Sequence, residues 1–134
     1  MITAVDTSVL VDALTPDERF GPQARDWLIA AYDAGAILVC DVVYAELAPR
    51  FPERAALDAA LRAVNATLSP IDSAMAWEAG RRWNRYRLAG GPRERILADF
   101  LIGAHALAAA DRFLTRDRGF YRSYFPELLQ SSAR

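Results

Sequence analysis

The chain of 134 residues has no lysine and only one cysteine and one histidine. Cys40 alone cannot form an internal disulfide, which suits a reducing compartment, and His105 alone cannot supply a histidine-rich metal site. Without lysine there is no Gly-Lys-Ser/Thr sequence, so the chain is not a phosphate-loop nucleotide hydrolase. The sequence also shows no leader-like segment and no apolar run long enough to span a membrane. We therefore expect a cytoplasmic protein that makes no membrane contact.

The composition is that of an ordinary globular protein, with 53% hydrophobic and 25% charged residues. The formal net charge is -1, so no overall basic field indicates nucleic-acid binding, and any such contact must come from a local patch. All 16 basic residues are arginine, whose guanidinium group suits bidentate contact with phosphate or carboxylate. Because the chain has no repeats, low-complexity tracts or linkers, residues 1–134 are expected to form a single domain.

Short apolar runs alternate with stretches of helical periodicity along the chain. The runs predict strands at residues 2–5, 37–40, 66–68 and 112–114. Helical spacing predicts helices at residues 9–14, 24–32, 42–47, 54–63, 74–88 and 96–110, with Thr7 or Ser8 capping the first of them. Because parallel strands need crossover connections, this alternation predicts an α/β sandwich of three layers, with a central, mostly parallel sheet flanked by helices.

Four acidic residues stand where predicted strands end or where the next helices begin. Asp6 and Asp117 follow the first and last strands, and Glu46 interrupts an apolar stretch near the start of the helix after the second strand. Asp99 interrupts a nearly continuous apolar helix, so it must face a wet cleft, meet a cation or cap the first turn. Taken singly, the others have ordinary interpretations: turn residues for Asp6 and Asp117, and a solvated helix residue for Glu46.

The ends of parallel strands share one edge of a sheet, so the four carboxylates are expected to converge there. Like charges held together repel one another, and a hard divalent cation with oxygen ligands removes that repulsion. Mg²⁺ or Mn²⁺ is favoured over Zn²⁺ because histidine and cysteine ligands are lacking. Two such ions activate water and stabilise both the attacking and the leaving oxygens of a phosphodiester. The acidic residues therefore predict a metal-dependent nuclease.

Four sequence segments span essentially the whole chain in a distinctive order. They are Val5-Asp6-Thr7-Ser8-Val9-Leu10-Val11-Asp12, Val43-Tyr44-Ala45-Glu46-Leu47, Asp99-Phe100-Leu101-Ile102-Gly103-Ala104-His105-Ala106-Leu107 and Leu114-Thr115-Arg116-Asp117. No single segment is specific. In their order, spacing and total length, however, they resemble the PIN-domain family, and more narrowly its VapC-type ribonuclease toxins from bacterial toxin–antitoxin pairs.

The resemblance implies a quartet of acids that binds Mg²⁺ or Mn²⁺, formed by Asp6, Glu46, Asp99 and Asp117. It places Ser8 at the small polar position that supports the first Asp, and Thr115 at the hydroxyl position before the last acid. It further implies endoribonuclease action, in which hydroxide attacks in line and leaves a 5′-phosphate and a 3′-hydroxyl. The implied partners are an RNA substrate, a second copy of the chain in a homodimer, and a cognate antitoxin whose C-terminal segment occupies the cleft.

Other features of the sequence leave alternatives open. Arg81, Arg82 and Arg85 lie in the densest basic stretch and form either a solvated helix face or a contact for RNA phosphate or antitoxin. His105, on an apolar helix, is expected to be a core or interface residue rather than a base. A receiver-type phosphorylation domain also carries acids at the ends of parallel strands. It is set aside because its sequence pattern requires a lysine near the end of the domain, and this chain has no lysine. The remaining alternative is a catalytically silent PIN-like domain that binds RNA or protein, and the presence of all four acids argues against it.

Overall fold

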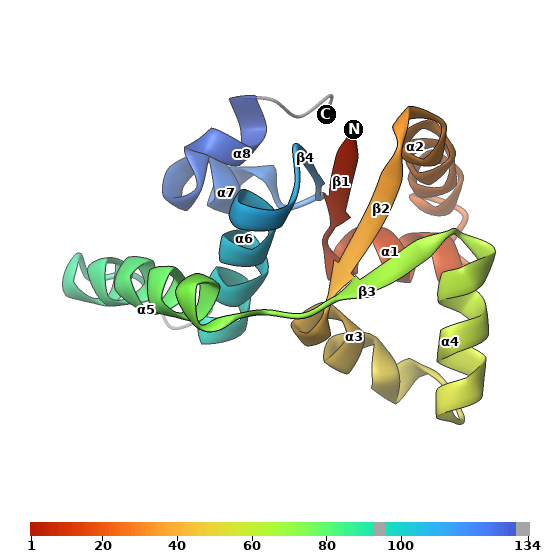
Figure 1. The fold of residues 1–134 in the computed structure, drawn as a ribbon, viewed down its shortest axis with the longest axis horizontal. Coiled ribbons are helices and arrows are strands. Elements are labelled where there is room, and N and C mark those ends of the chain that lie inside the picture. Colours follow the sequence, from red (N-terminus) through yellow and green to blue (C-terminus); the bar gives the residue numbers. More distant parts are fainter. Residues whose placement is uncertain (93–95, 131–134) are drawn as a thin grey trace.

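The computed structural model describes residues 1–92 and 96–130. Its described strands form one four-stranded sheet in the order β3-β2-β1-β4, and every pairing is parallel (Figure 1). The strands are β1 (Ile2–Val5), β2 (Ala36–Cys40), β3 (Ala66–Ser69) and β4 (Arg112–Leu114). The register sets Ala4 of β1 beside Leu38 on one side and Phe113 on the other. All four predicted strands are confirmed.

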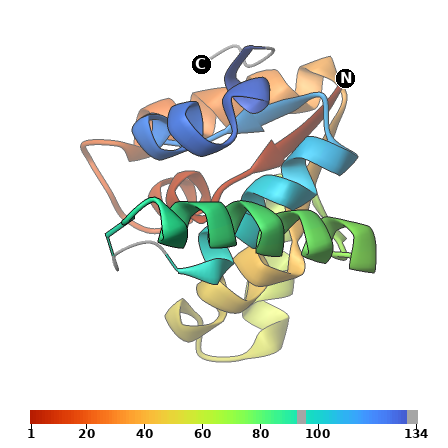
Figure 2. The ribbon, with the colours of Figure 1, turned by 90° about the vertical axis from the view of Figure 1, so that its left-hand side faces the viewer.

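Helices cover both faces of this sheet and complete the predicted α/β sandwich. They are α1 (Thr7–Leu14), α2 (Gly21–Ala34), α3 (Asp41–Leu47), α4 (Arg54–Ala63), α5 (Ser73–Leu88), α6 (Leu97–Ala109), α7 (Arg118–Tyr124) and α8 (Pro126–Gln130), with a short 3₁₀ helix η1 (Ala48–Arg50) after α3. Helices α1, α2 and α4 lie on one side of the sheet and α5 to α8 on the other (Figure 1). Figure 2 shows α5 as the outermost helix on its side, crossing in front of α6. Of the described helices, none combines the length and apolarity needed to cross a membrane.

The core on the α5 to α8 side is largely aromatic. Phe100 of α6 packs edge-on against Phe120 of α7, with 5.2 Å between ring centroids, and also contacts the Phe125 ring. A Cβ atom on Gly103 would lie 2.6 Å from that Phe125 ring, so glycine at this position lets the ring pack directly on the α6 backbone. The small residues of α6 therefore serve helix packing on the C-terminal segment.

The N-terminus of α1 differs from the prediction. Neither Thr7 nor Ser8 caps the helix. Asp6 is the N-cap residue, with extended backbone, and its carboxylate accepts a hydrogen bond from the Thr7 amide at 2.8 Å. An acid at the first free amides of a helix is favoured by both hydrogen bonding and the helix dipole. Asp6 thus ends β1 and begins α1 in a single residue.

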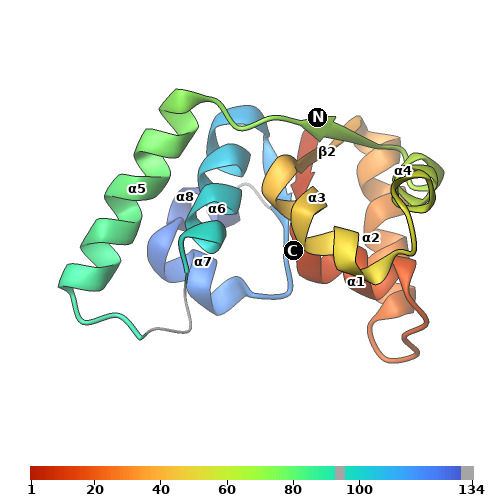
Figure 3. The same ribbon diagram turned by 90° about the horizontal axis from the view of Figure 1, so that it is seen from below.

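The carboxyl ends of the strands lie along one edge of the sheet, which Figure 3 shows from below. β1 leads into Asp6 and α1, β2 leads into α3, and β4 leads into residues 115–117. The first turn of α6 lies beside the same edge (Figure 3). Any side chains at these four points are therefore neighbours despite their separation in the sequence.

Candidate active site

Asp6 is a nearly buried carboxyl group at the centre of this edge, with 8% of the residue exposed. Its Oδ1 accepts from the Thr7 amide, and its Oδ2 accepts from the buried Thr115 hydroxyl at 2.6 Å. Burial, with smaller contributions from the negative charges of Glu46 and Asp99, raises the pKa of Asp6 to about 6, although the two hydrogen bonds oppose the rise. Glu46 and Asp99 therefore both lie within electrostatic reach of Asp6.

Asp99 lies in the first turn of α6, whereas Glu46 is the sixth of the seven residues of α3 and so lies near the end of that helix, not near its start as the sequence predicted. Thr7 Oγ1 donates a hydrogen bond to Glu46 Oε1 at 2.5 Å, which links the start of α1 to α3. Asp99 is the third residue of α6, and its Oδ2 accepts from the Ile96 amide at 3.2 Å. Asp99 therefore caps the first turn of α6, which is one of the three possibilities that its place in an apolar helix left open.

Thr7 is a site residue that the sequence reasoning did not assign. Its amide binds Asp6 and its hydroxyl binds Glu46, so it holds two acids from different elements. The available signal was its position, since a hydroxyl residue directly after a strand-end acid lies in the first turn of the next helix.

Asp117 joins the site through Thr115. The Asp117 amide donates to Thr115 Oγ1 at 2.9 Å, and the same hydroxyl donates to Asp6. Asp117 is also the N-cap residue of α7. Ser8 acts on this loop rather than on the first Asp, because its Oγ accepts from the Arg116 amide at 3.3 Å. Thr115 is thus the direct support of Asp6, and Ser8 an indirect one.

The PIN domain family model matches residues 3–126 of the chain. The chain belongs to the PIN domain family. Its fold is similar to that of VapBC2 from Rickettsia felis bound to a DNA fragment from their promoter, with a TM-score of 0.71 and 18% identity over 91% of this chain and 92% of that chain. At this identity the likeness concerns the fold. None of the curated proteins matches the chain.

Two further solved structures share the PIN fold. VapBC-1 from nontypeable Haemophilus influenzae has a TM-score of 0.66 and 18% identity, covering 96% of this chain and 95% of that chain. VapC20 from Mycobacterium tuberculosis, a sarcin-ricin loop cleaving toxin, has a TM-score of 0.62 and 17% identity, covering 88% and 93%. Each of the three alignments covers at least 88% of both chains.

The acids of this PIN domain have the donor chemistry of a hard divalent cation, since all of them offer carboxylate oxygens. The elevated pKa of Asp6 reflects burial and nearby negative charge, which a cation would offset. Within residues 1–92 and 96–130, however, no group of three or more His, Cys, Asp or Glu side chains is arranged to hold a metal ion.

A groove of about 530 Å³ opens beside Glu46, between α3 and α6. Val42 and Ala45 line it from α3, and Ala98 and Leu101 line it from α6. Its walls are mainly apolar, and Asp41 and Glu46 are the two acids that line it.

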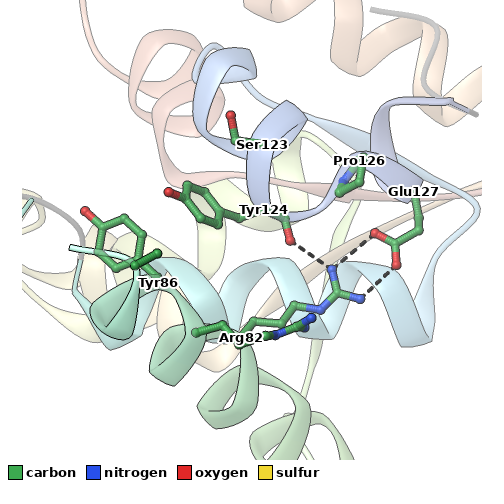
Figure 4. Close-up of a pocket in the computed structure, with 8 residues that line it drawn as sticks. Arg82, Tyr86, Ser123, Tyr124, Pro126 and Glu127 are labelled. Atoms are coloured by element: carbon green, nitrogen blue, oxygen red, sulfur yellow. Dashed lines mark hydrogen bonds and ion pairs between the residues drawn. The ribbon is translucent and has the colours of Figure 1, made fainter. Parts of the chain in front are cut away.

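Arg82 of α5 has a structural role in contacts with the C-terminal segment (Figure 4). Its Nη1 and Nη2 donate to both carboxylate oxygens of Glu127 at 3.1 and 2.8 Å, and Nη1 also donates to the Tyr124 carbonyl at 2.9 Å. Its Nε donates to Glu78 at 2.6 Å, and 12% of its side chain is exposed. The guanidinium group also lies over the Phe125 ring, 4.6 Å from its centroid. Arg82 therefore fastens α5 to α8 and is a poor candidate for RNA or antitoxin contact.

The other two arginines of the predicted contact, Arg81 and Arg85, have exposed side chains. Arg81 is 53% exposed and only loosely paired with Glu78, at 3.4 Å. Arg85 is exposed and lines the same cavity as Arg82. These two arginines remain available for phosphate or carboxylate groups.

His105 and Cys40 are core residues of this PIN domain. His105 is buried, and its Nε2 lies 2.9 Å from Ser69 Oγ at the end of β3. Burial lowers the pKa of His105 and raises the pKa of the Cys40 thiol. Both side chains therefore stay neutral and serve packing.

Proposed function

We propose that this PIN domain is a divalent-cation-dependent endoribonuclease, the toxin of a toxin–antitoxin pair that acts in the cytoplasm. The observation that carries the proposal is that Glu46 of α3 and Asp99 of α6 both act electrostatically on Asp6, the buried acid that follows β1. The VapC and VapBC structures of the same fold, one of them an RNA-cleaving toxin, support it.

In this proposal Asp6, Glu46 and Asp99 hold Mg²⁺ or Mn²⁺, with Asp117 completing the quartet. The bound cation supplies activation of water and neutralisation of charge on the phosphodiester. The chain itself supplies position: Thr115 and the Thr7 amide hold Asp6, and the Thr7 hydroxyl holds Glu46. Hydrolysis in line then leaves a 5′-phosphate and a 3′-hydroxyl on the RNA.

The proposed partners are a cognate antitoxin and a second copy of the chain. The apolar groove beside Glu46 supports docking of an antitoxin segment, since an occupant there would block the acids. Exposed apolar side chains near the junction of α5 and α6, such as Leu88 and Ile96, provide surface for a homodimer.

Cleavage of total bacterial RNA by the purified chain tests the proposal. The reactions contain Mg²⁺, Mn²⁺ or chelator, and the new RNA ends are mapped. We expect discrete cuts that need the metal and carry 5′-phosphates. Asp99→Asn should abolish them without unfolding the protein, because the carboxylate is replaced by a neutral group of the same shape.

The matched control is Asp33→Asn, which removes an exposed acid from α2, on the other side of the sheet. Asp33→Asn should cleave the RNA at the same sites and to the same extent as the parent protein. Absence of cleavage by folded, antitoxin-free protein would contradict the nuclease and favour the silent binding module.

A further inference from the structure

Arg116 lies between Thr115 and Asp117 in the loop that joins β4 to α7, and its side chain reaches back to α1. Its Nε donates to Asp12 Oδ2 at 2.6 Å, and its Nη2 donates to Asp12 Oδ1 at 3.3 Å. Its amide donates to Ser8, one helical turn before Asp12. Two consecutive turns of α1 therefore hold this one residue.

Asp12 is a buried acid that the proposed chemistry does not use. Asp12 is 3% exposed, and the Arg116 guanidinium group is the charged partner of its carboxylate. A buried ion pair is weak evidence for stability, since an apolar pair of similar volume packs at least as well. What the pair does provide is a fixed direction for the Arg116 side chain.

The Arg116 guanidinium group is also held by an aromatic ring. It lies over the Phe20 ring, 4.1 Å from the centroid, and Phe20 immediately precedes α2. Arginine suits this position because a planar group can stack on a ring and bind a carboxylate through two nitrogens at once. Although 40% of the side chain is exposed, the guanidinium group is thus held from two directions.

We propose that the Asp12–Arg116 ion pair is a positioning device for the acid site. By holding Arg116, it fixes the residues on either side of it: Thr115, whose hydroxyl binds Asp6, and Asp117, whose amide binds that hydroxyl. Arg116 acts on the reaction through Thr115 and Asp117 and does not touch substrate. The inference rests on the proposed function for its effect on catalysis, but its effect on the loop is independent of that function.

Arg116→Met tests the device, because it keeps the length of the side chain and its contact with Phe20 while removing the ion pair. We expect kcat to fall between about 10-fold and 100-fold with KM changed by less than about 2-fold, since the loop loses position rather than affinity for RNA. Arg116→Lys, which keeps the charge, should recover part of the loss. Arg122→Met, at an exposed arginine of α7, is the matched control and should behave as the parent does.

Amide hydrogen exchange supplies a readout that needs neither substrate nor metal. In Arg116→Met the Asp117 amide should exchange about 10-fold faster, while amides of β1 keep their rates. Unchanged exchange at Asp117, or kcat equal to that of Arg122→Met, would overturn the proposal. A rise in KM at constant kcat would also overturn it, because Arg116 would then be a substrate contact. If the parent chain cleaves no RNA, the proposed function fails, and the exchange rates still decide the positioning role.

Discussion

Asp6 is a carboxyl group whose surroundings resist its ionisation. Burial and the charges of Glu46 and Asp99 raise its pKa from 3.8 to about 6. An acid with a raised pKa in the folded state stabilises the fold while it is protonated, and this contribution is lost as the pH rises through the folded-state pKa. Ionised Asp6 therefore lowers the free energy of unfolding of the metal-free protein at neutral pH, and a bound cation would offset this loss.

Asp6→Asn should accordingly stabilise the metal-free protein in a pH-dependent manner. With chelator at about pH 7.5, we expect the free energy of unfolding to rise by about 1–3 kcal/mol, because the neutral amide carries no buried charge. At about pH 4 the parent Asp6 is itself protonated, so the gain should vanish. Urea denaturation at both pH values measures this, and an equal effect at the two would contradict the electrostatic account of Asp6.

At the scale of elements, α5 is held to the C-terminal helices by Arg82. Its bonds to Glu78 and Glu127 lower the pKa of both carboxyl groups. Arg82→Met should lower the free energy of unfolding by about 2 kcal/mol, because four charge-assisted hydrogen bonds are lost. Arg81→Met, at an exposed neighbour, should change it by less than about 0.5 kcal/mol.

The effect of Arg82→Met should also depend on pH. A carboxyl group with a lowered pKa stabilises the fold above its ordinary pKa and loses that contribution as the pH falls through the folded-state value. The difference between the parent and Arg82→Met should therefore shrink below about pH 4. Thermal unfolding across the acid range tests this, and a constant difference would show that Arg82 acts through packing on Phe125 alone.

The contact between α6 and the C-terminal segment depends on the absence of a side chain at Gly103. Gly103→Ala places a Cβ atom against the Phe125 ring, so we expect a loss of about 1–3 kcal/mol of unfolding free energy. Gly80→Ala is the matched control, because its Cβ atom meets nothing within 4 Å in the interior of α5. It should stabilise by about 0.5–1 kcal/mol through helix propensity. Equal effects of the two changes would contradict the packing role of Gly103.

For the whole molecule, the alternation of apolar runs with helical periodicity predicts the sheet and its three layers. The clearest local signal is that of β2, a short and continuous apolar run, whereas β3 alternates apolar and hydroxyl residues. The short helices α7 and α8 have no such signal. Phe120 and Tyr121 of α7, and Phe125 between the two helices, are ordered by packing on one another and on Phe100. Such helices form through tertiary contacts, which local periodicity does not report.

The candidate site, like the fold, can be predicted from the sequence only in part. The positions of Asp6 and Asp117 after β1 and β4 can be read from the order of elements, because parallel strands share a carboxyl edge. The positions of Glu46, near the end of α3, and Asp99, on a helix that follows another helix, cannot. The partners of these acids cannot, since Thr7 and Glu46 are 39 residues apart and Thr115 and Asp6 are 109 apart. The same reason explains Arg82, whose partner Glu127 is 45 residues away and turns an expected surface contact into an anchor.

Asp6, Glu46 and Asp99 act on one cation only if removing any one of them weakens its binding. Titration with Mn²⁺, followed by the electron paramagnetic resonance signal of the free ion, measures this directly on Asp6→Asn, Glu46→Gln, Asp99→Asn and the control Asp33→Asn. We expect the parent and Asp33→Asn to bind Mn²⁺ equally, and each of the other three to bind at least about 10-fold more weakly. Binding as tight in those three variants as in the parent would contradict the cation site at the carboxyl edge of the sheet.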